Sequence, residues 1–154
     1  MCGLLSRVAC IRYIYGMKIA PNLLTNRLTT ALVVDDDAFS RAIAQRVLNS
    51  LGVTGCAVAQ DGEEGLHILS HMAQAPDLIL CDIFMPNKDG IEFLDALAQS
   101  KFQGQVVLVS GGDPTMLEVA EKLGTHGGLN VTATLIKPLD REQLAHALGI
   151  KLGA

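Results

Sequence analysis

Residues 31–37 read Ala-Leu-Val-Val-Asp-Asp-Asp, an apolar run that ends in three acidic side chains. Further short runs rich in Val, Leu and Ile follow along the chain at 53–59, 78–81, 106–109 and 131–136. Near-continuous apolar runs of this length are typical of strands that are buried on both faces of a parallel sheet. The sequence therefore predicts five strands.

Longer stretches with apolar residues at helical spacing separate these runs. They cover 38–51, 63–73, 91–98, 113–123 and 140–148. In the fourth stretch, Asp113 is expected to cap the helix, Pro114 to take its first position and Gly124 to end it. Because strands and helices alternate, we expect an α/β fold with a doubly wound, five-stranded parallel sheet.

The composition fits one globular domain with an aliphatic core. Of the 154 residues, 49% are hydrophobic, 18% charged and 4% aromatic, which excludes disorder. So few aromatic side chains argue against a stacking surface for single-stranded nucleic acid. After the first thirty residues the chain carries sixteen acidic and eight basic residues, a net charge of −8. This charge argues against direct binding of a nucleic-acid backbone.

The four cysteines include no Cys-x-x-Cys pair, so neither a zinc site nor a disulfide framework is indicated. We expect reduced thiols and a cytoplasmic location. No stretch has the roughly 20 apolar residues that a membrane span needs, and stable membrane insertion is not expected.

Residues 1–28 are expected to be an N-terminal extension outside the core. Arg7 and Arg12 interrupt their apolar residues, which a secretory signal does not allow. A short amphipathic helix that associates with a membrane or a partner is the alternative for this segment. The domain itself is expected over 29–150, followed by a tail at 151–154.

Polar side chains follow the predicted strands where ligands of such sheets bind, at the carboxyl ends. They are Asp35, Asp36 and Asp37 after the first strand, Asp82 after the third, Ser110 after the fourth and Lys137 after the fifth. Clustered carboxylates repel one another unless a cation compensates them, and Mg²⁺ prefers oxygen ligands of this kind. A carboxylate nucleophile, a hydroxyl and an ammonium group together favour phosphoryl transfer to Asp82.

Four segments, in order, resemble the motifs of the receiver domains of two-component response regulators. They are Leu32–Asp37, Asp77–Gly90, Val109–Gly111 and Lys137-Pro138, within about residues 28–150. The resemblance implies a flavodoxin-like (βα)5 fold with strand order 2-1-3-4-5. It also implies that Asp82 accepts a phosphoryl group from a phosphohistidine.

The resemblance further implies a role for each polar side chain. Asp36, Asp82 and the backbone carbonyl of Phe84 are expected to hold Mg²⁺, with Asp35 supporting the metal mainly through water. Asp37 lies one position past the family's acid pair and is assigned no metal role.

The remaining two motifs are expected to contact the phosphoryl group. Ser110 stands where the family usually has Thr, as the switch hydroxyl, and Lys137 supplies the positive charge. The Lys137-Pro138 peptide is expected to be cis.

These roles describe a signalling module that is its own phosphoryl acceptor rather than a turnover enzyme. Its expected partners are a sensor histidine kinase or phosphotransfer protein and a downstream output domain or protein, and a phosphorylation-dependent homodimer is compatible with the family.

Two features depart from the family pattern. Thr134 replaces the aromatic residue that usually lies three positions before the lysine, which puts aromatic burial as the switch in doubt. Gly124–Asn130 is expected to be an unusually long glycine-rich connection. Together with Val109–Asp113 it is similar to receivers that precede cyclic-di-GMP phosphodiesterase domains.

Two other functions compete with this interpretation. A pseudo-receiver that docks partners without phosphorylation would share the fold. A haloacid-dehalogenase-type phosphatase also uses an Asp nucleophile with Mg²⁺, but Phe39 stands where its motif needs Thr or Val.

The four histidines are expected to be surface residues rather than ligands. No two of them lie with a carboxylate at a metal-like spacing that reaches the strand ends. They are His67, His71, His126 and His146.

Overall fold

The computed structural model describes residues 28–85 and 90–153, and the expectations for residues 1–27 fall outside this part. The strands are β1 Thr30–Val34, β2 Gly55–Ala59, β3 Leu78–Asp82, β4 Gln105–Ser110 and β5 Asn130–Ile136. The helices are α3 Ala38–Ser50, α4 Gly62–His71, α5 Gly90–Gln99, α6 Pro114–His126 and α7 Arg141–Ala147. All strand pairs are parallel, in the order β2-β1-β3-β4-β5. The predicted doubly wound α/β fold is confirmed.

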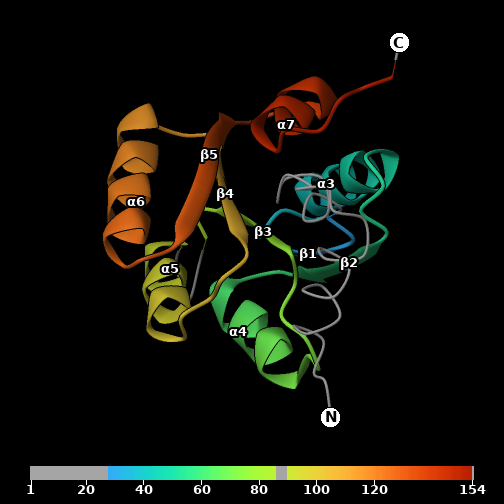
Figure 1. Ribbon diagram of the computed structural model, residues 1–154. Helices are drawn as coiled ribbons and strands as arrows, with labels where there is room; N and C mark the ends of the chain where they lie inside the picture. Colours follow the sequence, from blue (N-terminus) through green and yellow to red (C-terminus); the bar gives the residue numbers. More distant parts are fainter. Residues whose placement is uncertain (1–27, 86–89, 154) are drawn as a thin grey trace, which may run out of the picture.

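Two hydrophobic layers enclose the sheet, with α4, α5 and α6 on one face and α3 and α7 on the other (Figure 1). Side chains of a strand alternate between the faces. Leu32 and Val34 of β1 therefore pack toward α4 and α5, whereas Ala31 and Val33 pack toward α3 and α7.

Burial on both faces, which was predicted for every strand, holds for β1, β3 and β4. It is wrong for β2 and β5, whose residues are mostly half-exposed. These two are the edge strands, so each has only one neighbouring strand to cover it.

Helix α6 extends beyond its predicted end. Gly124 lies inside the helix and is buried, and Gly127 caps it, so the connection to β5 spans only residues 127–129. A Cβ atom at Gly124 would lie 2.9 Å from the side chain of Val131. This glycine therefore permits close packing of α6 on β5 and does not end the helix. Gly128, with a φ of +88°, provides the turn that follows.

The apolar run at 53–59 likewise contains more than a strand. Val53 is fully buried, but its N–H donates to the carbonyl of Leu48 in the turn that ends α3, and β2 starts two residues later. Leu28, which was assigned to the extension, is buried against the α3 side of the sheet.

None of the helices in residues 28–85 and 90–153 has the length and apolarity that crossing a bilayer requires.

Candidate functional site

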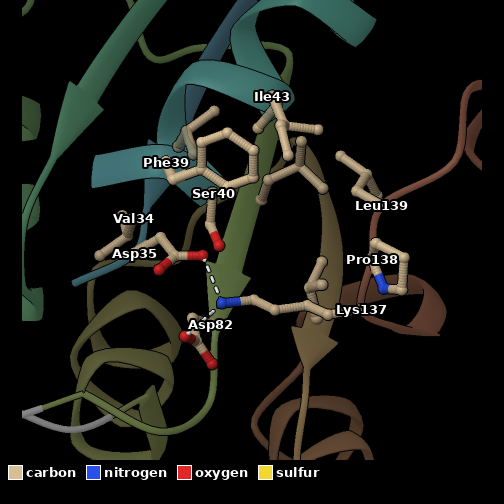
Figure 2. A pocket seen from close by; sticks show the side chains of 13 residues that line it. Val34, Asp35, Phe39, Ser40, Ile43, Asp82, Lys137, Pro138 and Leu139 are labelled. Atoms are coloured by element: carbon tan, nitrogen blue, oxygen red, sulfur yellow. Dashed lines mark hydrogen bonds and ion pairs between the residues drawn. The ribbon is translucent and has the colours of Figure 1, made fainter. Parts of the chain in front are cut away.

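Lys137 links two carboxylates at the carboxyl edge of the sheet. Its Nζ atom lies 2.8 Å from Oδ2 of Asp35 and 2.9 Å from Oδ2 of Asp82. Figure 2 shows the lysine side chain reaching from the end of β5 to the acids that follow β1 and end β3. Three strands that are far apart in the sequence thus bring their terminal charges together.

Backbone hydrogen bonds hold these strand ends in place. The Asp35 N–H donates to the Ala59 carbonyl of β2, and the Ile83 N–H donates to the Val109 carbonyl of β4, each at 3.1 Å. The Lys137 N–H donates to the Ser110 carbonyl at 2.9 Å. The parallel ladder therefore continues into the site, and the Lys137-Pro138 peptide is cis as expected.

The carboxylates of Asp35, Asp36 and Asp82 each place one oxygen within 4.8 Å of the others. Asp35 and Asp82 are 6% and 5% exposed, whereas Asp36 is exposed. Oδ1 of Asp82 also accepts the Phe84 N–H at 3.0 Å, so the Phe84 peptide lies against the same carboxylate. Three carboxylates and one ammonium group leave a local charge of −2, and this oxygen-rich donor set fits Mg²⁺.

Burial and hydrogen bonds shift the pKa values of Asp82 and Lys137 at the centre of the site. Loss of solvent raises the pKa of Asp82 above its ordinary value, although the hydrogen bond from Lys137 acts against this. Burial alone would lower the pKa of Lys137, but its bonds to Asp35 and Asp82 outweigh that effect and raise it. The lysine is therefore held in its charged form.

Asp37 has a structural task. Its side chain accepts the N–H and the hydroxyl of Ser40, both at 2.8 Å, and so caps α3. These two bonds lower the pKa of Asp37. The capping role agrees with its exclusion from the expected metal ligands.

Ser110 is fully buried at the end of β4, and its Oγ accepts the Gly112 N–H at 3.0 Å. Beside it, the Phe84 side chain is 46% exposed and lies over Gly112, since a Cβ atom at Gly112 would lie 2.8 Å from the ring. An aromatic ring and a glycine thus form this side of the mouth of the site.

Two features of the site were missed in the sequence. Arg41 donates from Nη1 to the Asp35 carbonyl at 2.7 Å and fixes the corner between β1 and α3. A mostly apolar cavity of about 320 Å³ adjoins Asp35, Asp82 and Lys137, between α3 and the Pro138-Leu139 segment, with Ile43 and the exposed Phe39 on its α3 side (Figure 2). The cavity depends on how α3 packs against the segment after β5, so no local motif signals it. The Arg41 bond spans only six residues but follows no sequence motif.

Comparison with known proteins agrees with this geometry. Residues 31–149 match the sequence model of the response regulator receiver domain. A probable chemotaxis protein CheY of Rhizobium etli is 32% identical over 126 residues, which are 80% of this chain and 92% of that protein. Other relatives are larger, and the chain spans 49% of one and 15% of another.

Solved structures show the same likeness. A response regulator from Colwellia psychrerythraea superposes with a TM-score of 0.67 and 30% identity, over 80% of this chain and 95% of that one. The CheX-CheY-BeF3-Mg complex from Borrelia burgdorferi gives a TM-score of 0.67 and 25% identity, over 77% of this chain and 85% of that one.

Proposed function

This chain belongs to the family of response regulator receiver domains, and from that premise we propose that it is a phosphorelay module whose phosphoryl acceptor is Asp82. The observation that carries the proposal is the double contact of Lys137 with Asp35 and Asp82. It sets an ammonium group beside a buried carboxylate, which is what an incoming phosphoryl group needs.

Each side chain has a part in accepting the phosphoryl group. An oxygen of Asp82 forms the new bond to phosphorus as the bond from phosphorus to the donor histidine breaks. Lys137 moves its positive charge from the free carboxylate to the phosphoryl oxygens. The Ser110 hydroxyl donates a hydrogen bond to one of those oxygens.

Asp36, Asp82 and the Phe84 carbonyl would hold Mg²⁺, with Asp35 in a supporting position. When bound, the ion neutralises the carboxylate cluster and the phosphoryl oxygens. The similar CheX-CheY-BeF3 complex from Borrelia burgdorferi contains Mg, which supports this assignment.

The proposed partners follow from the same role. A histidine kinase or phosphotransfer protein donates the phosphoryl group, and an output domain or protein binds the phosphorylated form. Phosphorylation-dependent homodimerisation is one possible output.

The protein catalyses only its own phosphorylation and dephosphorylation. We place it in the cytoplasm, which agrees with a cysteine spacing that indicates no disulfide framework. Because Leu28 packs into the core, we assign residues 28–150 to the domain, 1–27 to an extension and 151–154 to a tail.

Intact mass measurement after incubation with a small-molecule phosphodonor and Mg²⁺ tests the acceptor. We expect one added phosphoryl group on the wild type, none on Asp82→Asn, and none on the wild type in excess chelator, because the bare carboxylate cluster repels phosphate. Asp95→Asn, at an exposed position on α5, is the matched control and should be phosphorylated normally. An unmodified wild type would instead favour a pseudo-receiver, and phosphorylation that is unaffected by chelator would contradict the metal requirement.

A further inference from the structure

Helix α4 carries two histidines on one exposed face, far from the carboxylate cluster. His67 and His71 are four residues apart, and their ring centres lie 4.4 Å apart with the ring planes tilted by 45°. Residues at this spacing lie one above the other on a helix. Both side chains are exposed, as expected from the sequence, so solvent reaches the pair. The sequence does not predict them as ligands, because that prediction concerns only sites that reach the strand ends.

The environment of His71 determines which nitrogen can bind a ligand. Its Nδ1 lies 2.9 Å from the His67 carbonyl oxygen and 3.0 Å from Ser70 Oγ. A carbonyl oxygen only accepts hydrogen bonds, so Nδ1 carries the proton and Nε2 keeps its lone pair. Metal-binding histidines almost always donate their other ring N–H to a carbonyl or carboxylate in this way.

We propose that His67 and His71 form a binding site for a divalent transition metal such as Ni²⁺, Cu²⁺ or Zn²⁺. Two imidazoles that ligate one ion at about 2.0–2.1 Å in adjacent positions bring their ring centres to roughly 4.5–5 Å. The separation of 4.4 Å is close to this arrangement.

The position on the helix also favours a cation. His71 is the last residue of α4, where backbone carbonyls give the helix end a partial negative charge. Imidazole nitrogen selects first-row transition metals, while Mg²⁺ prefers oxygen. Water completes the coordination.

The site is separate from the carboxylate cluster in both place and chemistry. Helix α4 begins just after the carboxyl end of β2, and its ten residues span about 15 Å. The carboxylate cluster therefore lies at the carboxyl ends of the strands, whereas the histidine pair lies toward their amino ends. Ile68 stands where a zinc hydrolase of the His-Glu-x-x-His type has its catalytic Glu, so the site binds metal without a general base for hydrolysis.

Calorimetric titration of the untagged full chain with Ni²⁺ tests the site, in excess Mg²⁺ so that the carboxylate cluster is occupied. We expect Ni²⁺ affinity to fall at least about tenfold in His67→Ala and in His71→Ala, because each removes half of the chelate. His126→Ala and His146→Ala, at exposed positions on α6 and α7, should bind Ni²⁺ like the wild type.

A relocated histidine separates chelation from histidine content. The double variant His71→Ala, Ala73→His keeps the number of histidines but loses the spacing of four, and it should bind Ni²⁺ no better than His71→Ala. The proposal is wrong if either single variant at 67 or 71 keeps wild-type affinity, if the control variants lose as much, or if the relocated histidine restores binding. Unfolding midpoints measured without metal should be equal in all variants, since the side chains are exposed.

Discussion

Asp36 differs from Asp35 and Asp82 in being exposed, although the three carboxylates lie together. Lys137 contacts the two buried acids and leaves Asp36 to be compensated by another cation. We therefore expect Mg²⁺ to raise the melting temperature by binding the native cluster, with about 2.7 kcal/mol of stabilisation at one hundred times the Kd. Asp36→Ala should lose most of this shift in a thermal scan with and without Mg²⁺.

Asp37→Asn is the control for that experiment. An asparagine still caps α3, and Asp37 is not expected to bind metal, so the Mg²⁺-dependent shift should remain. A full shift in Asp36→Ala would contradict the assignment of Asp36 as a ligand.

We expect Phe84 and Gly112 to control how water approaches Asp82. Hydrolysis of an aspartyl phosphate needs a water in line with phosphorus, and neither residue can hold that water through its side chain. The ring also lies over Gly112. The phosphorylated form should therefore be long-lived, and Phe84→Asn with Gly112→Glu should speed phosphate loss at least about tenfold, or about 1.4 kcal/mol of barrier.

The two changes at the mouth of the site are coupled. A Cβ at Gly112 meets the ring at 2.8 Å, so Gly112→Glu alone must displace Phe84, whereas Phe84→Asn removes the obstacle. Phosphate loss is followed by intact mass in the wild type, both single variants and the double variant. If the double variant loses phosphate no faster than the wild type, access of water does not limit the lifetime.

At the level of helices and strands, the sequence predicts the order and type of every element within residues 28–85 and 90–153, but not all of their ends. Periodicity identifies α6, and Asp113 and Pro114 mark its start correctly, because capping is local chemistry. Its end is different: Gly124 has the residue type of a terminator, yet contact with Val131 of β5 decides its role. The glycine-rich connection, part of the likeness to receivers before cyclic-di-GMP phosphodiesterase domains, is correspondingly shorter than predicted.

The same distinction applies to the site. Asp82, Ser110 and Lys137 are predictable, because parallel strands bring their carboxyl ends to one edge. The cavity beside α3 is not, since it depends on long-range packing between α3 and the segment after β5. The bond from Arg41 to the Asp35 carbonyl is short-range but follows no sequence motif.

Asp77 joins the start of β1 to the start of β3. Its Oδ2 atom accepts the N–H groups of Thr29 and Thr30 at 2.9 and 3.1 Å and both hydroxyls at 3.2 Å. Burial alone would raise the pKa of Asp77, but these hydrogen bonds outweigh it and lower the pKa below the ordinary 3.8. The ionised side chain therefore stabilises the folded state.

Removal of the Asp77 side chain should lower the free energy of unfolding by an amount that depends on pH. Because the folded-state pKa is depressed, the stabilisation is present above the ordinary value of 3.8 and is lost as pH falls through the folded-state value. We expect Asp77→Ala to lose about 1–3 kcal/mol of unfolding free energy at neutral pH and less in acid. Urea unfolding at both pH values measures this, with the exposed Asp95→Ala as control. An equal loss at both pH values would show that the negative charge of Asp77 does not contribute to the stability of the folded state.

Across the whole molecule, the end of β4 connects the proposed phosphoryl site to α6. Ser110 is buried, and its Oγ accepts the N–H of Gly112, in the loop that leads to the Asp113 cap of α6. Position 134 is Thr and offers no aromatic ring to bury, so we expect the signal to pass through this loop. Val119 and Leu123 of α6 have exposed apolar side chains, so we expect a partner to detect the change on this helix.

Phosphorylation must therefore bias two arrangements of the loop and of α6, since a signal requires a difference between states. When the Ser110 hydroxyl turns toward a phosphoryl oxygen, the Gly112 N–H loses or weakens its acceptor, and the amides that follow should exchange at altered rates. Hydrogen exchange with mass spectrometry on the phosphorylated and unmodified chain should show changes within residues 110–130, and Ser110→Ala should reduce them at equal phosphorylation. The account is wrong if no amide in this range responds, because the hydroxyl would then transmit nothing to α6.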